Sequence, residues 1–335
     1  MDVLWYNSDI RGQNPIFGGR EMKRSILFLV GVVLLAGSVS ADTFGTGENE
    51  FTIDFVNISG DSGDLGSWDA GYTFSGVNHG DYRMGTYEIT NDQFAKFAAN
   101  TPYWTGADVP ANQVSWYEGA QFVNYLNTST GHQAAYNFTG STFSVWKSGD
   151  AGYDSSNPFR NTYAYYFMPT EDEWVKAAYW NGTSLQTYAN ASAGDLVSGI
   201  PDPAKWNYSS SSPWDTENGS MELNGTYNMM GNVWEWTESP YDNGVYAPGG
   251  TRGIRGGAYV VGSSHLMSSQ LVSGWPVYEE DYIGFRVASV APCDYILIGD
   301  VNDDCKFDLR DFAEMSMNWL IDCFATPGDP ACVPK

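Results

Sequence analysis

The chain has 335 residues, a hydrophobic fraction of 42% and a formal net charge of -24, with only 16 lysines and arginines. This length fits one large domain with a small one, or two of middling size, and the charge argues against nucleic acid, which binds through Lys and Arg. Aromatic residues make up 16% of the chain, and its 37 glycines exceed the usual share of about 7%. The composition therefore indicates a loop-rich domain whose irregular segments are pinned by large rings.

The first expected element is an export signal. The positive start Met22-Lys23-Arg24, the apolar run SILFLVGVVLLAG and the small residues Val39-Ser40-Ala41 follow one another as in a signal peptide. We therefore predict a signal peptide over 22–41, cleavage after Ala41, and a secreted or cell-surface protein with no membrane span in its mature form. Residues 1–21 then precede a true start at Met22; an N-terminal membrane anchor is the alternative.

One strand and three helix starts can be predicted next. FTIDFVNIS, residues 51–59, alternates apolar and polar residues as a strand does. Three Ser or Thr residues are each followed three positions later by Gln or Glu, the pattern of a reciprocal capping box at a helix start. These pairs are Thr90 with Gln93, Ser115 with Glu118, and Thr170 with Glu173.

The amino-acid composition changes twice in the second half of the chain. Residues 183–226 are rich in Ser, Asn, Gly, Pro and Asp, which favours a long ordered loop over regular structure. From YNMMGNVWEW to IGFRVAS the sequence becomes strand-like and aromatic. A domain boundary is expected near Ala291-Pro292-Cys293, where the cysteines begin.

Six segments of the chain form an ordered set of motifs. They are MGTYEITNDQFAKF, VPANQVSWYEGAQFVNYLN, FMPTEDEWVKAAYWNG, YNMMGNVWEWTESPY, RGIRGGAY and YIGFRVAS. Together they resemble the sulfatase-modifying-factor domain of formylglycine-generating enzymes, and GNVWEW and RGG followed by GFR are the most specific parts. The resemblance covers residues 51–291 and implies an α+β fold that is irregular, loop-rich and C-type-lectin-like.

The resemblance also implies a copper site that this chain lacks. Catalytic members bind Cu(I) through two cysteines downstream of RGG and oxidise a sulfatase cysteine with oxygen; Cu(I) prefers soft thiolates. Counted from Gly256-Gly257, those positions hold Val261 and Leu266, and residues 1–292 contain no cysteine. We therefore expect neither bound copper nor a catalytic residue set here, and a filled apolar patch in its place.

A different oxidising metal is the alternative. Some relatives bind nonheme iron through a histidine-rich partner domain. The present chain has only His79, His132 and His265, without clustered spacing. A polar surface histidine is the simpler interpretation of His265, which lies next to the altered copper positions.

Calcium is the cofactor that the resemblance does imply. Family members bind it at the turn containing GNVWEW. The ligands that the resemblance implies here are the side chains of Asn228 and Glu235 and the carbonyls of Gly231 and Val233. Hard oxygen ligands suit calcium. The alternative is that Asn228 and Glu235 only cap the turn. A second family site begins at residues resembling Asn207 and Tyr208, but its other half is not recognisable.

The tail over 293–335 predicts a second calcium-binding unit. GDVNDDCKFDLRDF has the spacing of a helical dockerin-like or EF-hand-like loop, with Cys305 in place of the usual glycine. A cohesin-like partner would follow from that resemblance. The four cysteines predict two disulfides, with a zinc site as the weaker alternative; a disulfide-stapled cap with a solvated acidic turn is the alternative to calcium. The expected ligands are Asp300, Asn302, Asp304, Lys306 (carbonyl), Asp308 and Asp311, and the cysteines are Cys293, Cys305, Cys323 and Cys332.

Three functions compete. The first is an exported, non-catalytic binding module for a glycan or protein ligand, with a tail that assembles or anchors it. The second is a divergent oxidoreductase of the same superfamily that uses other residues. The third is a purely structural surface or matrix protein. The fold alone does not choose among them.

Overall fold

The computed structural model describes residues 40–60, 67–68, 72–73, 81–190, 196–241 and 244–291. These residues all belong to one compact unit, Ala36–Lys335. Residues 1–39 lie outside the described residues, as does the dockerin-like tail over 293–335 with its predicted calcium ligands and cysteines. In the described part of the chain, no helix is long and apolar enough to cross a membrane.

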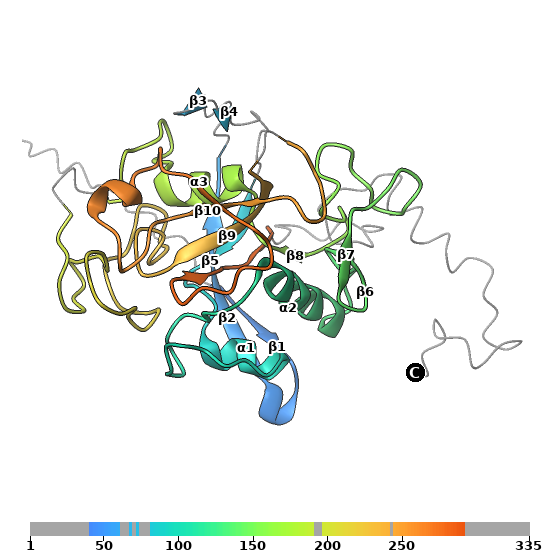
Figure 1. The fold of residues 1–335 in the computed structure, drawn as a ribbon, viewed down its shortest axis with the longest axis horizontal. Coiled ribbons are helices and arrows are strands. Elements are labelled where there is room, and N and C mark those ends of the chain that lie inside the picture. The colour runs from blue at the N-terminus through green and yellow to red at the C-terminus, as the bar shows by residue number, and fades with distance from the viewer. Residues whose placement is uncertain are drawn as a thin grey trace, which may run out of the picture. The chain divides into compact units, whose positions relative to one another are not determined.

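The larger sheet has five strands in the order β1-β2-β5-β13-β8, and each neighbouring pair is antiparallel. It joins segments that are far apart in the chain, because β13 pairs with both β5 and β8. Its strands β1 and β2 lie side by side in Figure 1. The strands are β1 (Ser40–Phe44), β2 (Phe51–Ile58), β5 (Tyr82–Gly85), β8 (Tyr166–Phe167) and β13 (Ala288–Val290).

The strand predicted for residues 51–59 is confirmed as β2, but its buried side chains belong to two different core clusters. Phe51, Ile53 and Phe55 face one buried cluster, whereas Val56 and Ile58 belong to another. Successive side chains of a strand point to opposite faces. The C-terminal half of β2 is therefore buried on both sides of the sheet.

The smaller sheet contains the end of the segment GNVWEW, because its strand β9 begins at Trp234. Its order is β11-β10-β9-β12, with β12 parallel to β9 and the other pairs antiparallel. This confirms the strand-like interpretation of the region between YNMMGNVWEW and IGFRVAS. The strands are β9 (Trp234–Pro240), β10 (Arg252–Arg255), β11 (Val272–Gly274) and β12 (Ile283–Gly284); the separate two-stranded pairs are β3 (Ser67–Trp68) with β4 (Tyr72–Thr73) and β6 (Asn137–Thr139) with β7 (Thr142–Ser144).

All three predicted helix starts are confirmed as complete capping boxes. Helix α1 is Asn91–Phe97, α2 is Trp116–Ser129 and α3 is Glu171–Tyr179, with N-caps at Thr90, Ser115 and Thr170. Two short 3₁₀ helices, η1 (Gly47–Asn49) and η2 (Ser263–Leu266), add single turns. Between α3 and β9 the described residues form no named helix or strand, as predicted for 183–226.

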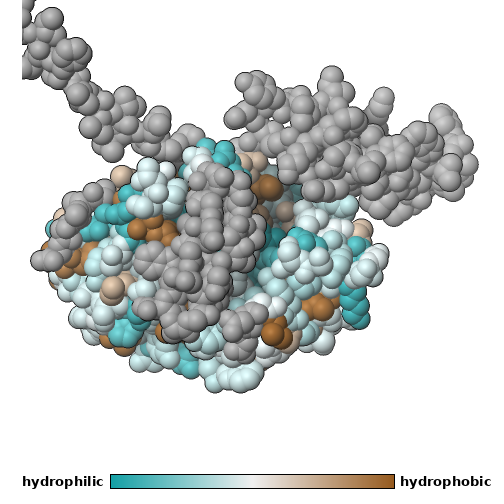
Figure 2. Space-filling model, turned by 90° about the horizontal axis from the view of Figure 1, so that it is seen from above, coloured by the Kyte–Doolittle hydropathy of each residue, from teal (hydrophilic) through white to brown (hydrophobic). Residues whose placement is uncertain are grey.

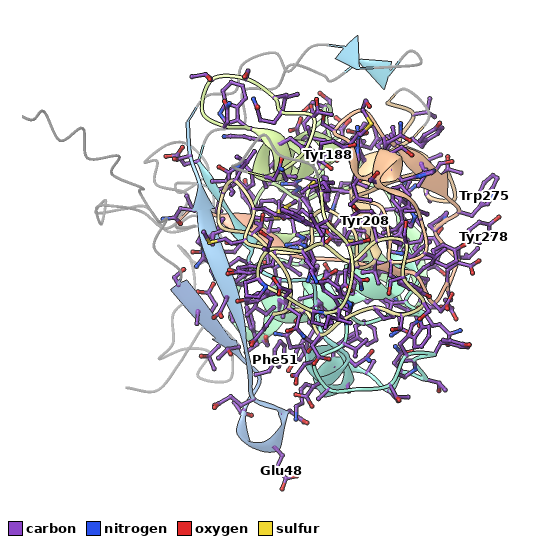
Figure 3. All side chains as sticks on the ribbon, turned by 90° about the vertical axis from the view of Figure 1, so that its left-hand side faces the viewer. Glu48, Phe51, Tyr188, Tyr208, Trp275 and Tyr278 are labelled. Atoms are coloured by element: carbon purple, nitrogen blue, oxygen red, sulfur yellow. The ribbon has the colours of Figure 1, made fainter. Side chains whose placement is uncertain are left out.

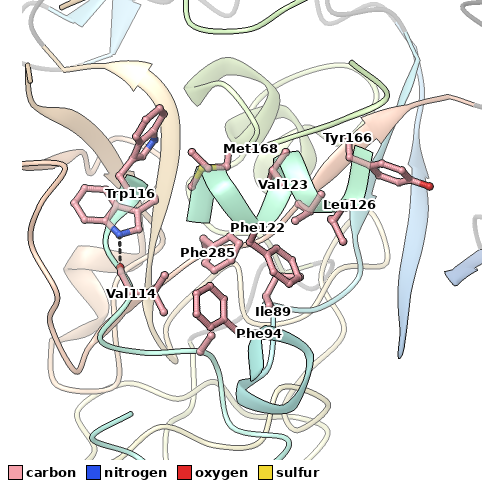
Figure 4. Close-up of a cluster of buried hydrophobic side chains, with 14 of the residues drawn as sticks. Ile89, Phe94, Val114, Trp116, Phe122, Val123, Leu126, Tyr166, Met168 and Phe285 are labelled. Carbon is pink, nitrogen blue, oxygen red and sulfur yellow. Dashed lines mark hydrogen bonds between the residues drawn. The ribbon is translucent and has the colours of Figure 1, made fainter. Parts of the chain in front are cut away.

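Large aromatic side chains fill the main core. Phe94 of α1 stacks on Phe122 of α2 with ring centroids 5.7 Å apart, and Phe122 meets Phe285 edge to face at 5.7 Å. Trp236 lies in the same cluster and donates its indole N–H to the carbonyl of Val114 at 3.1 Å (Figure 4). The indole and phenol groups can be buried because their polar atoms find partners.

Strand β1 includes Ser40 and Ala41, the last two residues of the predicted signal peptide. Cleavage after Ala41 would leave the Asp42 carboxylate at the start of the strand, where it accepts hydrogen bonds from Arg83 at 2.9 and 2.5 Å. That ion pair ties the edge strand to β5. The cleavage position stays a prediction.

Candidate functional site

A buried ion pair anchors the turn that carries GNVWEW. Arg286 donates from Nε to Glu235 Oε2 at 2.7 Å and from Nη2 to Oε1 at 2.6 Å, and Trp174 Nε1 donates to Oε2 at 2.7 Å. The remaining Arg286 N–H groups donate to the carbonyls of Gly85, Thr86 and Tyr227. Glu235 and Arg286 are fully buried. A buried arginine with every donor satisfied holds β9, β5 and the turn together.

A second buried carboxylate lies beside this pair. Asn232 Nδ2 donates to both oxygens of Glu88 at 3.1 and 3.2 Å, and Asn228 Nδ2 donates to Oε2 at 3.3 Å. Both asparagines have left-handed backbones, with φ of 57° and 59°, a conformation that Asn tolerates better than most residues. Burial, followed by the charge of Glu235, raises the pKa of Glu88 well above its usual value.

A third carboxylate, Glu222, holds the start of the turn. Its oxygens accept hydrogen bonds from the backbone N–H groups of Met229 and Met230 at 3.0 and 2.9 Å and from the Thr226 hydroxyl at 3.2 Å. Burial raises the pKa of Glu222 to about 8, although Arg286 and these hydrogen bonds favour the ionised form. Glu222 therefore changes charge near neutral pH.

This raised pKa predicts stability that falls as pH rises. Between the unfolded pKa near 4.5 and the folded pKa of about 8, the folded chain holds a proton that the unfolded chain releases, so the free energy of unfolding decreases through that window. Burial raises the pKa of Glu88 and Glu238 in the same direction. Thermal denaturation of Glu222→Gln from pH 5 to 8 should give a flatter slope than the wild type; an unchanged slope would contradict the assignment to Glu222.

The four residues predicted to bind calcium lie on this single turn. Asn228 faces Glu88, the Gly231 N–H donates to the Gly256 carbonyl at 2.9 Å, Val233 is buried, and the carboxylate of Glu235 is already engaged by Arg286 and Trp174. The three carboxyl groups Glu88, Glu222 and Glu235 all lie close enough to Arg286 to raise its pKa. Calcium binding there stays a prediction.

Val261 and Leu266, which the register from Gly256-Gly257 predicts to stand where related enzymes have copper ligands, are apolar. Leu266 is 0% exposed and contacts the second core cluster, and Val261 is partly buried against both clusters. Leu266 packs so closely on Gly257 that an added Cβ there would lie 2.8 Å from its Cδ1. These side chains offer no donor atoms to a metal, so the residues present do not fit copper.

A loop that contains Ser209 and Ser210 is hydrogen-bonded to the segment that carries Val261. The Ser209 N–H donates to the carbonyl of Val261 at 2.8 Å, and the Ser210 N–H donates to the carbonyl of Tyr259 at 2.7 Å. Ser209 has a left-handed backbone, with φ of 50°. The Tyr179 hydroxyl donates to the Leu266 carbonyl at 2.9 Å from the other side. Leu266 is therefore enclosed by apolar packing, whereas Val261 remains partly exposed.

The histidines do not gather into a metal site in the described residues. His265 is exposed and meets Trp234 edge on at 6.5 Å, which fits a surface histidine. His132 stacks on Tyr165 with ring centroids 4.7 Å apart. His79 lies outside the described residues. Where side chains are described, no three His, Cys, Asp or Glu residues are placed to hold a metal ion together.

A set of exposed aromatic and apolar side chains was not predicted from the sequence. Tyr103 is 61% exposed, Trp275 51%, Val277 63% and Tyr278 44%. Trp275 and Tyr278 project outward next to each other from the loop after β11 (Figure 3). Together with the partly buried Trp104, these residues are called the aromatic face below.

A chain of contacts holds the aromatic face in place. Trp104 lies edge on between Tyr103 and Tyr259, at centroid distances of 5.0 and 5.7 Å, and donates its indole N–H to the Tyr259 hydroxyl at 3.0 Å. That hydroxyl donates to Asp281 Oδ2 at 3.0 Å, and the Tyr278 N–H donates to the Trp275 carbonyl at 2.9 Å. These contacts connect Trp104 and Tyr259 with Asp281, three residues after Tyr278.

Exposed apolar side chains indicate a binding surface only when several of them lie close together. On the face seen from above, hydrophobic residues form separate spots among hydrophilic ones (Figure 2). Single exposed apolar side chains are normal on soluble domains. The linked rings of the aromatic face are therefore the better candidate for ligand contact.

The fold and the buried turn define a mixed domain with few helices in its described part, two main sheets and long irregular segments stabilised by buried ion pairs. The model of the sulfatase-modifying factor enzyme 1-like domain matches residues 32–291, so the chain belongs to that family. No curated protein sequence matches it.

Solved structures share this fold. Treponema denticola variable protein 1 aligns with a TM-score of 0.58 at 18% identity, covering 76% of this chain and 100% of its own. CarF aligns with a TM-score of 0.51 at 21% identity, covering 71% and 98%. PvdO from Pseudomonas aeruginosa has a TM-score of 0.48 at 16% identity, covering 76% and 99%. At these identities the similarity concerns the fold alone.

Proposed function

We propose that this chain is an exported, non-catalytic member of its family that binds a glycan or protein ligand through the aromatic face of a C-type-lectin-like domain. One observation carries the proposal: the two positions that would hold copper are filled by Val261 and by the fully buried Leu266. With no cysteine in residues 1–292, the domain has no thiolate to hold Cu(I) at these positions. What it presents to solvent instead is a pre-organised set of rings.

The rigidity of the aromatic face supports a role in recognition. Tyr and Trp supply large contact areas at a low cost in conformational entropy, and their rings are the groups that most often dominate binding energy. The hydrogen bonds from Trp104 to Tyr259 and from Tyr259 to Asp281 hold these three side chains in place before any ligand arrives. Pre-organisation of this kind favours affinity.

Calcium and the tail belong to the same proposal. Calcium bound by Asn228, Gly231, Val233 and Glu235 would stabilise the turn, and the dockerin-like tail would attach the domain to a cohesin-like partner. Calcium that binds only the folded state, at a concentration of about 100 times its Kd, adds about 2.7 kcal/mol to the free energy of unfolding.

Thermal denaturation compares the chain in calcium with the chain in chelator. The Tm should be higher with calcium, and the increase should be smaller for Asn228→Ala; magnesium serves as the control.

Metal content tests the non-catalytic part against the oxidoreductase alternative. The full chain, with its tail cysteines alkylated so that they cannot bind metal, is loaded with Cu(I) or Fe(II), dialysed and analysed for metal. The proposal predicts no stoichiometric copper or iron. One retained copper or iron per chain would instead favour an oxidoreductase that uses other residues.

A further inference from the structure

The strongest additional feature is the sign of the charge around the aromatic face. The segments that build it, residues 99–118 and 256–284, contain no Lys or Arg. They do contain five carboxylates, and none of these takes part in any of the described ion pairs. The carboxylates are Asp108, Glu118, Glu279, Glu280 and Asp281.

Three of these carboxylates follow Tyr278 directly and lie on the surface. Glu279 is exposed, and Glu280 and Asp281 are partly exposed. The Gln113 N–H donates to the Glu280 carbonyl at 3.1 Å, which brings this loop against the start of α2, where Glu118 lies. Burial, followed by the negative charge of Glu118, raises the pKa of Glu279. Glu118 and Glu279 therefore repel each other, and neither takes part in an ion pair among the described residues.

We propose that the aromatic face binds a cationic peptide segment, with Arg or Lys side chains placed over Trp275 and Tyr278 and paired with Glu279, Glu280 and Asp281. This rests on the proposed binding function and specifies its ligand. A cation over an aromatic ring gains from the ring's negative face, and Trp is the best such ring. The same cation relieves the repulsion between neighbouring carboxylates.

The alternative ligands fit this surface less well. An anionic ligand would be repelled by the five carboxylates. A neutral glycan could stack on the rings, but it would leave the charge of the carboxylates uncompensated. A metal ion alone would use the carboxylates and ignore the exposed rings. A peptide with alternating cationic side chains uses both, because the rings and the carboxylates lie in the same loop, residues 275–281.

Three synthetic peptides of equal length test the proposal by isothermal titration with the full chain. They carry Arg, Gln or Glu at alternate positions between glycine and serine. The Arg peptide should bind, and more weakly at high salt, whereas the Gln and Glu peptides should not. Trp275→Ala and Tyr278→Ala should each weaken binding about two- to thirtyfold, the range expected for an exposed to partly desolvated cation–π contact. Both rings are well exposed, so these variants should fold.

Matched variants separate a site from general attraction to an acidic protein. Asp202→Asn removes one exposed carboxylate elsewhere, and Ile200→Ala removes an exposed apolar side chain elsewhere; neither should change binding. Glu280→Gln should weaken it. Equal effects of Asp202→Asn and Glu280→Gln, or no effect of Trp275→Ala, would overturn the proposal.

A glycan array completes the test. A glycan bound by the wild type and lost in Trp275→Ala, without binding of the Arg peptide, would overturn the cationic ligand and leave the binding function standing. No ligand of either class that depends on Trp275 would overturn both.

Discussion

Replacing Arg286 by methionine is expected to destabilise the domain by about 3–5 kcal/mol, the usual cost of removing one partner from a buried ion pair. Arg286 is fully buried and holds both oxygens of Glu235 as well as three backbone carbonyls. Its loss would leave Glu235 without a counter-charge beside Glu88. Urea denaturation followed by tryptophan fluorescence measures the loss directly.

A surface ion pair provides the matched control. Lys96→Met breaks the pair with Asp92, whose charged atoms are 3.8 Å apart on the exposed side of α1, and should cost less than about 1 kcal/mol. In the double variant Arg286→Met/Glu235→Gln, part of the stability should return, because the stranded charge is gone. A loss for Arg286→Met no larger than for Lys96→Met would refute the central structural role of this pair.

Gly231→Ala is the second substitution with a large expected effect, about 2–6 kcal/mol. Gly231 has a φ of +94°, and an added Cβ would lie 2.3 Å from the backbone oxygen of Asn207. A left-handed residue other than glycine costs about 1–3 kcal/mol, and overpacking against backbone adds a similar amount. The turn would have to move away from the loop that begins at Asn207.

Gly244→Ala separates the two causes. Gly244 also has a positive φ, +76°, but nothing lies within 4 Å of an added Cβ. It should therefore show only the backbone cost of about 1–2 kcal/mol. Similar stabilities of the two alanine variants in chemical denaturation would show that the close approach of Gly231 to Asn207 is unimportant.

Local patterns allowed the helices to be predicted. Each capping box depends on two residues three positions apart and on the backbone between them, so Thr90, Ser115 and Thr170 identified the starts of α1, α2 and α3 without tertiary information. The strand β2 was predicted for the same reason. Its second buried face was not, because Val56 and Ile58 are buried by packing from distant segments.

Non-local contacts explain what the sequence could not predict. The strands β5 and β8 are short, and their partner β13 lies far along the chain, so no alternation marks them. Arg286 was visible in the motif GFR, but its partner Glu235 is 51 residues away. Only the fold brings these two charges together.

The candidate binding site was hidden for a similar reason. The segment WPVYEED, residues 275–281, resembles neither a strand nor a helix, and exposure cannot be read from composition when aromatic residues are so common. One signal was present: apolar residues run directly into an acidic cluster with no alternation between them. The absence of cysteine at Val261 and Leu266, by contrast, needed only the register from Gly256-Gly257, and the packing of Leu266 agrees with it.

Oxidation of a cysteine-containing, sulfatase-derived peptide is the most direct test of the central claim. The full chain is incubated with copper, oxygen, reductant and the peptide, beside an active formylglycine-generating enzyme as the positive control, and the peptide is analysed for aldehyde by mass spectrometry. Because Val261 and Leu266 supply no thiolate, we predict an unchanged peptide with this chain and aldehyde with the control. Turnover of the peptide to its aldehyde by this chain would contradict it.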